Sequence, residues 1–337
     1  MKYLVTGGSG FIGSMFIKKA FEVSSDLEIL NIDCLTYASN NNNTKSFQGN
    51  NKYNFLKINI QDINSLKSAI FEFKPNRIIH FAAESHVDNS IISPENFIKT
   101  NVNGTYNLLK LSEEYYKKYL DIGLTNFCFH HISTDEVFGD LAINADPSIE
   151  SDVYKPSSPY SASKAAADHL VKAWHRTYGL PYTITYCTNN YGPFQHKEKL
   201  IPLVISKIIN KEKIPVYGDG LQTRSWIYVE DHVKILLRLI KNNIFNTEFN
   251  ISHNNEITNL DLVERICETI NKIKPDKKKK SYKNLITFVE DRLGHDRRYA
   301  LDSSKIEKTL GKTEMHSLTK GLEKTISWAI NSSELYE

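Results

Sequence analysis

A glycine-rich turn near the start of the chain does most to restrict the folds it can adopt. The apolar stretch Lys2–Thr6 predicts a buried strand, Phe11–Val23 has the apolar spacing of a helix, and glycines occupy positions 7, 8, 10 and 13 around their junction. Glycine allows a tight turn and lets a ligand approach the helix N-terminus, where free amides favour negative charge. The spacing satisfies both GxxGxxG and GxGxxG. Alone this is a weak signal, but between a strand and a helix it predicts a dinucleotide-binding βαβ unit.

Asp33 strengthens this interpretation. Glu28–Ile32 predicts a second strand, and Asp33 lies at its end, 20 residues past Gly13. A carboxylate at this point can accept hydrogen bonds from both ribose hydroxyls and would repel a 2′-phosphate. We therefore expect NAD rather than NADP, bound by Gly7, Gly10, Gly13 and Asp33. A purely structural glycine turn is the alternative.

Strands and helices alternate through the first half of the chain. Further strands are expected near Phe55–Ile60 and at Arg77–Ala82, Asn126–Ile132 and Thr183–Cys187, with helices near Asn64–Phe73, at Pro94–Leu120 and from Pro159 or Tyr160 to Tyr178. Nearly continuous apolar strands, each followed by a helix, predict an α/β fold with a doubly wound, Rossmann-like parallel sheet. The polar stretch Tyr37–Asn54 has no periodicity and is expected to be an exposed loop without chemistry.

The pattern becomes irregular beyond Asn189, where prolines and the turn Gly218–Gly220 interrupt it. Helices are expected at Lys199–Asn210, Glu230–Lys241, Asn259–Ile273 and Leu318–Ile330, among short strands. We predict an NAD-binding domain over residues 1–188 and a smaller, mixed, mainly substrate-binding lobe over residues 189–337, with part of 226–254 returning to the first domain.

Composition favours a cytoplasmic enzyme. A net charge of +3 gives no electrostatic case for nucleic acid or membrane as the main partner. No leader precedes the first strand, and no apolar run approaches the length of a membrane span. The four cysteines, which form no CxxC pair, are expected to be reduced and mostly buried, with no disulfide or metal site: Cys34, Cys128, Cys187 and Cys267. Lys277–Lys280 is expected to be a solvated loop.

Two motifs carry the candidate chemistry. Tyr160 and Lys164 form a YxxxK pair that, on a helix, places the amine one turn beyond the phenol, where positive charge lowers the proton affinity of the phenol. Thr134, Asp135 and Glu136 follow an apolar stretch, and adjacent carboxyl groups can divide the roles of acid and base.

The two carboxyl groups must differ in proton affinity to take opposite roles. In one desolvated pocket their repulsion keeps one of them protonated, and the sequence leaves open which. A regular strand would point Asp135 away from Thr134 and Glu136, so the backbone is expected to leave strand geometry by about Ser133. A helix N-terminus rich in Ser, Thr, Asp and Glu is the alternative.

The combined motifs resemble the extended short-chain dehydrogenase/reductases that act on nucleotide sugars, and among them the dTDP-glucose 4,6-dehydratase family. The likeness runs from Lys2 to about Trp328. Besides the glycine loop and YxxxK, it rests on the segments Ala82–Asp88, Thr134–Gly139, Asn189–Pro193, Glu198–Pro202 and Gly294–Tyr299. The adjacent Asp-Glu pair is specific evidence, because 4-epimerases of this class usually have small polar residues there.

The resemblance implies a hydro-lyase that converts dTDP-glucose to dTDP-4-keto-6-deoxyglucose in deoxysugar and cell-surface polysaccharide biosynthesis. Tyr160, aided by Lys164, would take the C4 hydroxyl proton while NAD accepts hydride. Glu136 would remove the C5 hydrogen, Asp135 would protonate the departing C6 hydroxyl, and Thr134 would bind the C4 oxygen. A UDP- or CDP-glucose 4,6-dehydratase, a nucleotide-sugar 4-epimerase and a nonenzymatic cofactor-holding protein remain alternatives.

The resemblance also implies the remaining contacts. Around NAD it places Phe11, Ile12, Asp33, Cys34, Leu35, Thr36, Asn59, Ile60, Ala82, Ala83, Glu84, Thr100, Tyr160, Lys164 and Asn190. Around the nucleotide sugar it places Ser85, Thr134, Asn189, Lys199, Leu200, Pro215, Val216, Tyr217, Arg224, Asn259, Asp291, Arg292, Leu293, Gly294 and His295. Asn259 could equally cap the following helix. Relatives pair two long helices per subunit, which implies a homodimer through Pro94–Leu120 and Tyr160–Tyr178, although aromatic residues on them could be core instead: Tyr106, Tyr115, Tyr116 and Trp174.

Overall fold

A parallel sheet forms the centre of the molecule in the computed structural model, which describes residues 1–120, 123, 126–276 and 280–332. Its seven strands lie in the order β10-β6-β5-β4-β1-β2-β3, and all neighbours pair in parallel. Their bounds are Lys2–Thr6 (β1), Glu28–Asp33 (β2), Tyr53–Lys57 (β3), Arg77–His80 (β4), Cys128–Thr134 (β5), Tyr182–Cys187 (β6) and Thr247–Ile251 (β10). The predicted doubly wound α/β fold is confirmed.

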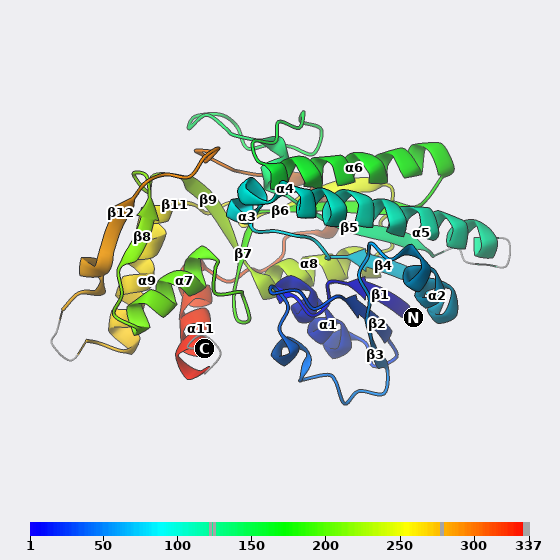
Figure 1. Ribbon diagram of the computed structural model, residues 1–337, viewed down its shortest axis with the longest axis horizontal. Helices are drawn as coiled ribbons and strands as arrows, with labels where there is room; N and C mark the ends of the chain where they lie inside the picture. Colours follow the sequence, from blue (N-terminus) through cyan, green and yellow to red (C-terminus); the bar gives the residue numbers. More distant parts are fainter. Residues whose placement is uncertain (121–122, 124–125, 277–279, 333–337) are drawn as a thin grey trace.

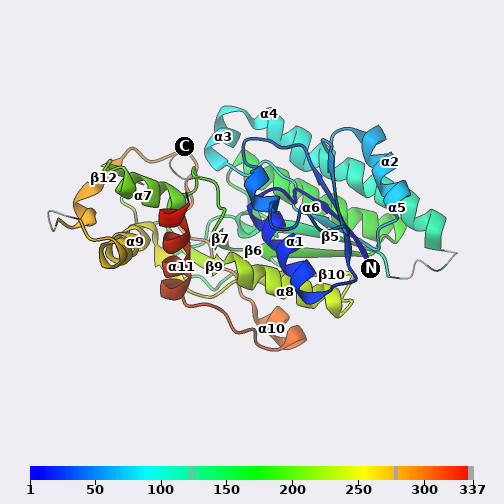
Figure 2. The same ribbon diagram turned by 90° about the horizontal axis from the view of Figure 1, so that it is seen from below.

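Helices cover both faces of this sheet (Figures 1 and 2). On one face lie α1 (Phe11–Val23) and α8 (Val229–Lys241), which share a core with the strands that includes Phe16, Ile17, Leu236 and Leu239. On the other lie α2 (Ile63–Phe73), α5 (Thr105–Leu120) and α6 (Pro159–Tyr178), whose core includes Leu66, Leu108, Leu109 and Val171. Apolar side chains on both sides explain why the strands are nearly continuous apolar runs.

A smaller lobe holds two short sheets and a third hydrophobic core. One sheet contains β7 (Asn189–Tyr191), β9 (Thr223–Tyr228) and β11 (Glu256–Thr258), and the other pairs β8 (Ile214–Tyr217) with β12 (Ile286–Val289). Around them pack α7 (Leu200–Ile209), α9 (Asn259–Ile273) and α11 (Leu318–Asn331), while α10 (Ser304–Leu310) contacts β10. Between β9 and β11 the chain crosses back, so that α8 packs on α1 and β10 joins the edge of the large sheet beside β6.

The prediction that Tyr37–Asn54 is an exposed loop is wrong. The segment contains a 3-10 helix, η1 (Asn41–Thr44), and buries Asn43, Thr44 and Phe47. Asn43 Nδ2 donates to the Ser9 carbonyl at 3.2 Å, which fixes the segment against the glycine loop. Asparagine side chains here bond to backbone groups, a form of order that leaves no hydrophobic period in the sequence.

The single helix expected at Pro94–Leu120 is also wrong. The chain forms α3 (Val87–Ile92), α4 (Pro94–Phe97), a π-helical stretch η2 (Ile98–Gly104) and then α5. Asn101 lies in the wide turn, where its side chain accepts from Glu84 N at 2.8 Å and donates to Ser163 Oγ at 2.9 Å. These long-range bonds favour the π turn, which the local helical pattern cannot reveal.

Smaller expectations have mixed outcomes. Cys34, Cys128, Cys187 and Cys267 are free, and all but Cys34 are buried. Thr258, not Asn259, caps α9, since its side chain accepts from Asp261 N at 3.1 Å. The solvated loop expected at Lys277–Lys280 lies mostly outside the described residues, which do not include 277–279. Among the described residues, no helix is long and apolar enough to cross a bilayer.

Candidate functional site

The glycine loop opens the site at the carboxyl end of β1. Gly7 has φ +72°, and a Cβ there would lie 2.6 Å from Ala82 N, while a Cβ on Gly13 would lie 2.3 Å from the Gly7 carbonyl oxygen. The turn therefore requires glycine at both positions. No side chain caps the N-terminus of α1 at Gly10, and its first turn holds no acidic residue. Its free amides remain available to an anion such as a pyrophosphate.

Asp33 lies beside this loop at the end of β2. It is only 6% exposed, and its carboxylate accepts from Ser9 N at 3.0 Å, from Leu35 N at 2.8 Å and from Ser39 Oγ at 2.9 Å. These donors hold the carboxylate in place next to the turn, which is the geometry expected for a ribose-binding group. The glycine cradle and this carboxylate fit a dinucleotide.

The ends of β3 and β4 supply further residues of the predicted cofactor site. After β4, Glu84 N donates to Asn101 Oδ1 and the Glu84 carbonyl accepts from Asn101 Nδ2, which fixes the Ala82–Glu84 segment. After β3, the Asn59 side chain accepts from Gln61 N at 2.9 Å, and Gln61 in turn donates to Thr100 Oγ1 at 3.2 Å. Asn59 and Ala82–Glu84 thus follow the ends of β3 and β4, and Thr100 lies in η2.

Thr134, Asp135 and Glu136 lie where β5 ends. The strand continues through Thr134 and a 3-10 helix, η3 (Asp135–Phe138), begins at once, so the expected departure by Ser133 occurs one to two residues later. Parallel pairing with β6 as far as Cys187 holds the strand to that point. Thr134 Oγ1 donates to Asp135 Oδ1 at 3.1 Å, while Asp135 Oδ2 is buried without a hydrogen-bond partner among the described residues.

Burial raises the pKa of both Asp135 and Glu136, but the charged groups around the two side chains differ. For Asp135, burial and then the neighbouring Glu136 raise the pKa from 3.8 to about 7. For Glu136, burial raises the pKa, and three nearby cations oppose it: Arg292, Arg224 and Lys199. The surroundings therefore favour a proton on Asp135 and negative charge on Glu136.

Tyr160 and Lys164 lie in the first turns of α6, which begins with a capping box on Ser158. Lys164 Nζ donates to the Ile132 carbonyl at 2.8 Å and lies 3.3 Å from His131 Nε2. Burial and the Glu136 carboxylate raise the pKa of Tyr160 well above 10, and its hydrogen bond to Thr134 opposes the rise. In the protein alone, burial thus outweighs the lowering of the phenol pKa that we expected from Lys164.

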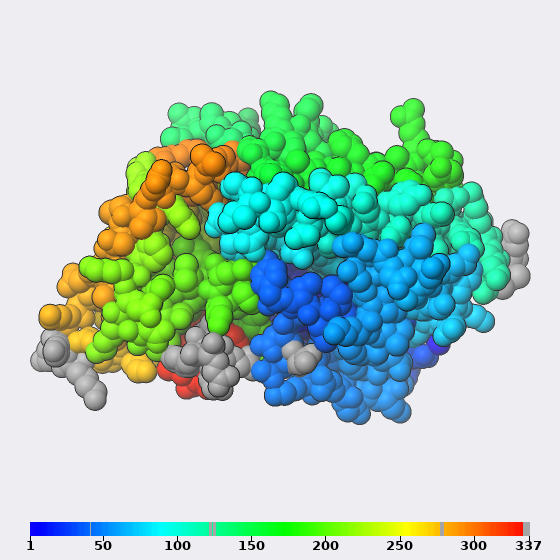
Figure 3. All heavy atoms as spheres, viewed as in Figure 1, coloured from blue at the N-terminus to red at the C-terminus, as the bar shows by residue number. Residues whose placement is uncertain are grey.

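The cations of the smaller lobe face this centre. Lys199 Nζ donates to the Ser85 carbonyl at 2.8 Å, and Arg292 pairs with Asp88 at 3.4 Å, so both bridge the two lobes. Figure 3 shows the green second lobe abutting the cyan and blue segments of the first. Arg224 is 4% exposed and donates to the carbonyls of Thr223, Asp296 and Arg297. These bonds occupy part of the Arg224 guanidinium, which the family resemblance places around the nucleotide sugar.

The other predicted substrate residues fall into three groups. Some border the lobe contact, where Asp291 accepts from Gln222 at 3.0 Å and pairs with His295 at 2.6 Å, and the Tyr217 ring lies edge-on to His295. Val216 is committed to the fold, since its side chain lies in the third core. The same holds for Asn190, which was predicted around NAD and whose side chain bonds to His232 and the Thr188 carbonyl. The remainder lie on strands, turns and the first residues of helices in the same lobe: Asn189, Leu200, Pro215, Asn259, Leu293 and Gly294.

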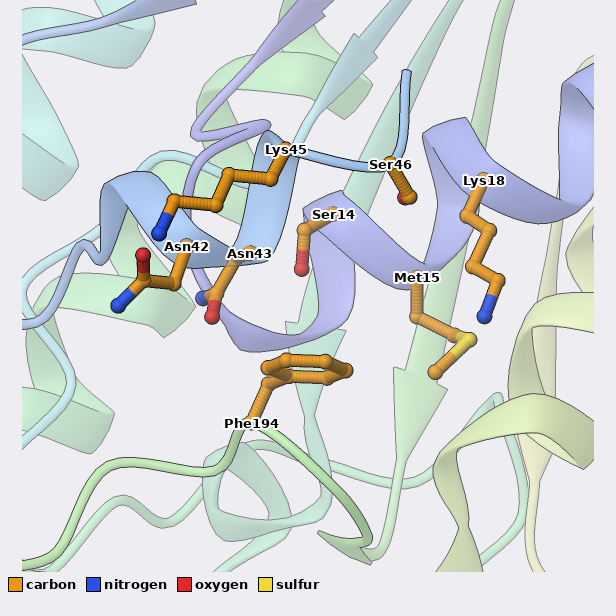
Figure 4. A pocket seen from close by; sticks show the side chains of 8 residues that line it. All are labelled: Ser14, Met15, Lys18, Asn42, Asn43, Lys45, Ser46 and Phe194. Atoms are coloured by element: carbon orange, nitrogen blue, oxygen red, sulfur yellow. The ribbon is translucent and has the colours of Figure 1, made fainter. Parts of the chain in front are cut away.

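A separate hollow of about 370 Å³ lies beside α1 (Figure 4). Figure 4 shows the Phe194 ring facing α1 and η1, with Lys18 and Lys45 extending around it. Its lining residues are Ser14, Met15, Lys18, Asn42, Asn43, Lys45, Ser46 and Phe194. None is a predicted site residue, so the hollow is distinct from the carboxyl pair and YxxxK.

Three buried polar residues of the site were not predicted. Asn101 joins the Glu84 segment to α6, and His131 and Asp168 lie behind Lys164, with 3.2 Å between His131 Nε2 and Asp168 Oδ1. A polar residue inside an apolar strand, as in Phe127–Ile132, was the available signal for His131. Asp168 is one helical turn past Lys164, and this spacing could have drawn attention to it.

Comparisons with known proteins give a consistent result. The family model described as GDP-mannose 4,6 dehydratase matches residues 4–325. A dTDP-glucose 4,6-dehydratase of Haemophilus influenzae is 46% identical over 335 residues, covering 99% of each chain.

Solved structures agree. That of the dTDP-glucose 4,6-dehydratase of Bacillus anthracis in complex with NAD is 38% identical, covers 99% of this chain and 98% of that chain, and has a TM-score of 0.87. The Streptomyces venezuelae enzyme of the same name, with NAD bound, is 35% identical, covers 99% of this chain and 100% of that chain, and has a TM-score of 0.90.

Proposed function

Since the chain belongs to the nucleotide-sugar 4,6-dehydratase family, we propose that it is a hydro-lyase that converts dTDP-glucose to dTDP-4-keto-6-deoxyglucose and water with bound NAD. The observation that carries the proposal is the pair of adjacent carboxyl groups, Asp135 and Glu136, in unlike surroundings beside the buried Tyr160 and Lys164.

The first step is oxidation at C4 of the hexose. Tyr160 removes the proton from the C4 hydroxyl, while Thr134 donates a hydrogen bond to the same oxygen. The ammonium of Lys164 stabilises the phenolate that this requires, against the burial that raises the pKa of Tyr160. NAD, when bound by the glycine loop and Asp33, supplies the redox chemistry by taking hydride from C4 and later returning it to C6.

The second step is loss of water across C5 and C6. The C4 ketone makes the C5 hydrogen acidic, and Glu136, surrounded by cations, removes it as a proton. Asp135, whose pKa of about 7 keeps a large share of it protonated at neutral pH, gives its proton to the departing C6 hydroxyl. Reduction at C6 and protonation at C5 then complete the 6-deoxy sugar.

Product analysis tests the activity and its alternatives together. The protein is incubated with dTDP-, UDP- and CDP-glucose, and the masses of the products are measured by mass spectrometry. We expect loss of one water from dTDP-glucose, with deuterium placed at C4 appearing at C6. A product of unchanged mass with a retained hydroxymethyl group would instead identify a 4-epimerase, and no turnover would favour a cofactor-holding protein.

Replacement of Glu136 by Gln tests the assignment of the base. The variant should bind substrate and still oxidise C4, giving a transient NADH signal at 340 nm, while kcat falls by roughly 100-fold or more. Exchange of the C5 hydrogen with deuterated solvent should stop. Exchange at the wild-type rate would remove Glu136 from the mechanism.

We also propose a homodimer through α5 and α6. Tyr106 on α5 is 40% exposed and lies edge-on to Trp174 of α6, and Tyr178 is 42% exposed on the same helix pair. By contrast, Tyr115 is buried in the first core. Exposed aromatic residues on paired helices are typical of an interface.

Sedimentation tests this assembly. At micromolar concentration the protein should sediment at twice its chain mass of 38.7 kDa, and Tyr106→Glu should shift it to monomer. Phe288→Glu, which places the same charge at a 57% exposed aromatic position of the other lobe, should leave the dimer intact. A wild-type monomer would contradict the assembly.

A further inference from the structure

Behind the catalytic lysine lies a buried group of polar residues to which the mechanism above gives no role. Lys164 is 4% exposed, and His131 and Asp168 are fully buried. His131 Nε2 lies 3.3 Å from Lys164 Nζ and 3.2 Å from Asp168 Oδ1, so one ring nitrogen stands between the ammonium and the carboxylate. Burying a cation and an anion is costly unless each has a partner.

The strand below this helix orients Asp168. Ser133 Oγ donates to Asp168 Oδ2 at 2.7 Å, while Oδ1 has no hydrogen-bond partner among the described residues and lies 3.2 Å from His131 Nε2. Asp168 also lies one turn beyond Lys164 on α6, where side chains four residues apart share a face. The helix and β5 together therefore fix the distance between the two charges.

Other groups around the pair do not supply a second buried anion at neutral pH. Burial raises the pKa of Cys187 to about 12, raises the pKa of Tyr154, Tyr160 and Tyr186, and lowers the pKa of His80 and His131, so all of these are neutral. Glu248 lies further out, 3.8 Å from Lys172 and bonded to Tyr182. The titratable and charged groups that interact with Lys164, His131 or Asp168 are His80 (β4), His130 (β5), Tyr186 and Cys187 (β6), Tyr154 from the preceding loop, and Lys172 (α6).

Asp135 and Glu136 already have roles in the proposed reaction, and three cations of the second lobe act on Glu136: Lys199, Arg224 and Arg292. Asp168 is the buried carboxylate whose charge opposes the effect of burial on Lys164. We propose that Asp168, acting through His131, keeps the buried ammonium of Lys164 charged and oriented, and is a positioning residue for oxidation at C4. This inference rests on the proposed function.

The negative charge of Asp168 determines the direction in which the pKa of Lys164 shifts. Burial lowers the pKa of Lys164, and Asp168 raises it again. Removing the carboxylate should let the pKa of Lys164 fall further, so that the lysine loses its charge at lower pH. An opposite charge at this range shifts a pKa by about 1 to 3 units. The alkaline limb of C4 oxidation should move down in pH accordingly.

The test isolates C4 oxidation with dTDP-6-deoxyglucose, a substrate that has no C6 hydroxyl to eliminate, so NADH accumulates at 340 nm. In Asp168→Asn the alkaline limb of the NADH rate should move to lower pH by about 1 unit or more. Asp168→Glu should restore it toward the wild-type position. A uniform loss of rate in Asp168→Asn with an unmoved limb would overturn the proposal.

A second variant keeps the proposal testable if Asp168→Asn does not fold. His131→Gln keeps an acceptor for Lys164 but removes the ring between the two charges, and it should move the limb in the same direction by a smaller amount. An unmoved limb there would also overturn the proposal. A wild-type protein inert toward both dTDP-glucose and dTDP-6-deoxyglucose would instead refute the proposed function.

Discussion

At the scale of single residues, neighbouring carboxyl groups acquire different roles through their surroundings. Asp135 is enclosed, with Oδ2 unpartnered among the described residues, whereas Glu136 lies within reach of Arg224, Arg292 and Lys199. The sequence shows that two such groups must separate in proton affinity. Only the folded chain shows that three cations of the second lobe oppose the rise in the pKa of Glu136, whereas Arg224 alone among them opposes the rise for Asp135.

The effect of this arrangement on the free energy of unfolding can be measured with a variant of Asp135. Folding raises its pKa from 3.8 to about 7, so the fold prefers the neutral form. The stability that this preference contributes is fully present below about pH 4 and is lost as pH rises through 7. Asp135→Asn, which is always neutral, should therefore gain stability over the wild type by roughly 1 to 3 kcal/mol at pH 8 and by nothing near pH 4.

Chemical denaturation at pH 5, 6, 7 and 8 checks this prediction. The difference in the free energy of unfolding should grow with pH in favour of Asp135→Asn, while water elimination is abolished. A pH-independent difference would mean that Asp135 keeps an ordinary pKa in the fold.

At the scale of elements, two glycines of the strand–turn–helix at the start of the chain are expected to have different roles, one in folding and one in NAD binding. Gly13→Ala places a Cβ 2.3 Å from the Gly7 carbonyl and 2.9 Å from Gly8 Cα, whereas at Gly10 the nearest atom is 3.3 Å away. We expect Gly13→Ala to destabilise the protein by roughly 1 to 3 kcal/mol, because rigid backbone must move. Gly10→Ala should fold almost normally and lose NAD affinity, since the backbone of this turn is proposed to lie against the pyrophosphate.

Thermal unfolding of each variant, with and without added NAD, separates the two effects. Gly13→Ala should unfold at lower temperature even without NAD. Without NAD, Gly10→Ala should unfold at the same temperature as the wild type. Addition of NAD should raise its unfolding temperature less than that of the wild type. Equal behaviour of the two variants would contradict this division of roles.

Elements whose signals are local could be predicted, and those fixed by distant contacts could not. Lys2–Thr6 and Phe11–Val23 carry their own periodicity, and the structure has them at these bounds. The π turn at Ile98–Gly104 depends on Asn101, whose partner Ser163 is 62 residues away. The role of Asp168 likewise depends on Ser133 and His131 in β5, and no pattern within α6 reveals those contacts.

At the scale of the whole molecule, the chain crosses between its lobes and ties them into one unit. From the second half, α8 packs on α1 and β10 extends the sheet beside β6. The core on this face joins Phe16 and Ile17 of α1 with Val233, Leu236 and Leu239 of α8. The boundary proposed after residue 188 therefore separates functions along the sequence more sharply than it separates folding units.

A fragment of residues 1–188 tests this view. It keeps the glycine loop, Asp33 and YxxxK, but it exposes the apolar face of α1 and leaves β6 as an open edge. Such surfaces favour aggregation over a stable fold. We expect the fragment to be poorly soluble, to show no cooperative unfolding and to bind no NAD, whereas the full chain unfolds in a single transition. A soluble fragment that binds NAD with wild-type affinity would show that β10 and α8 add little, and that the first domain folds by itself.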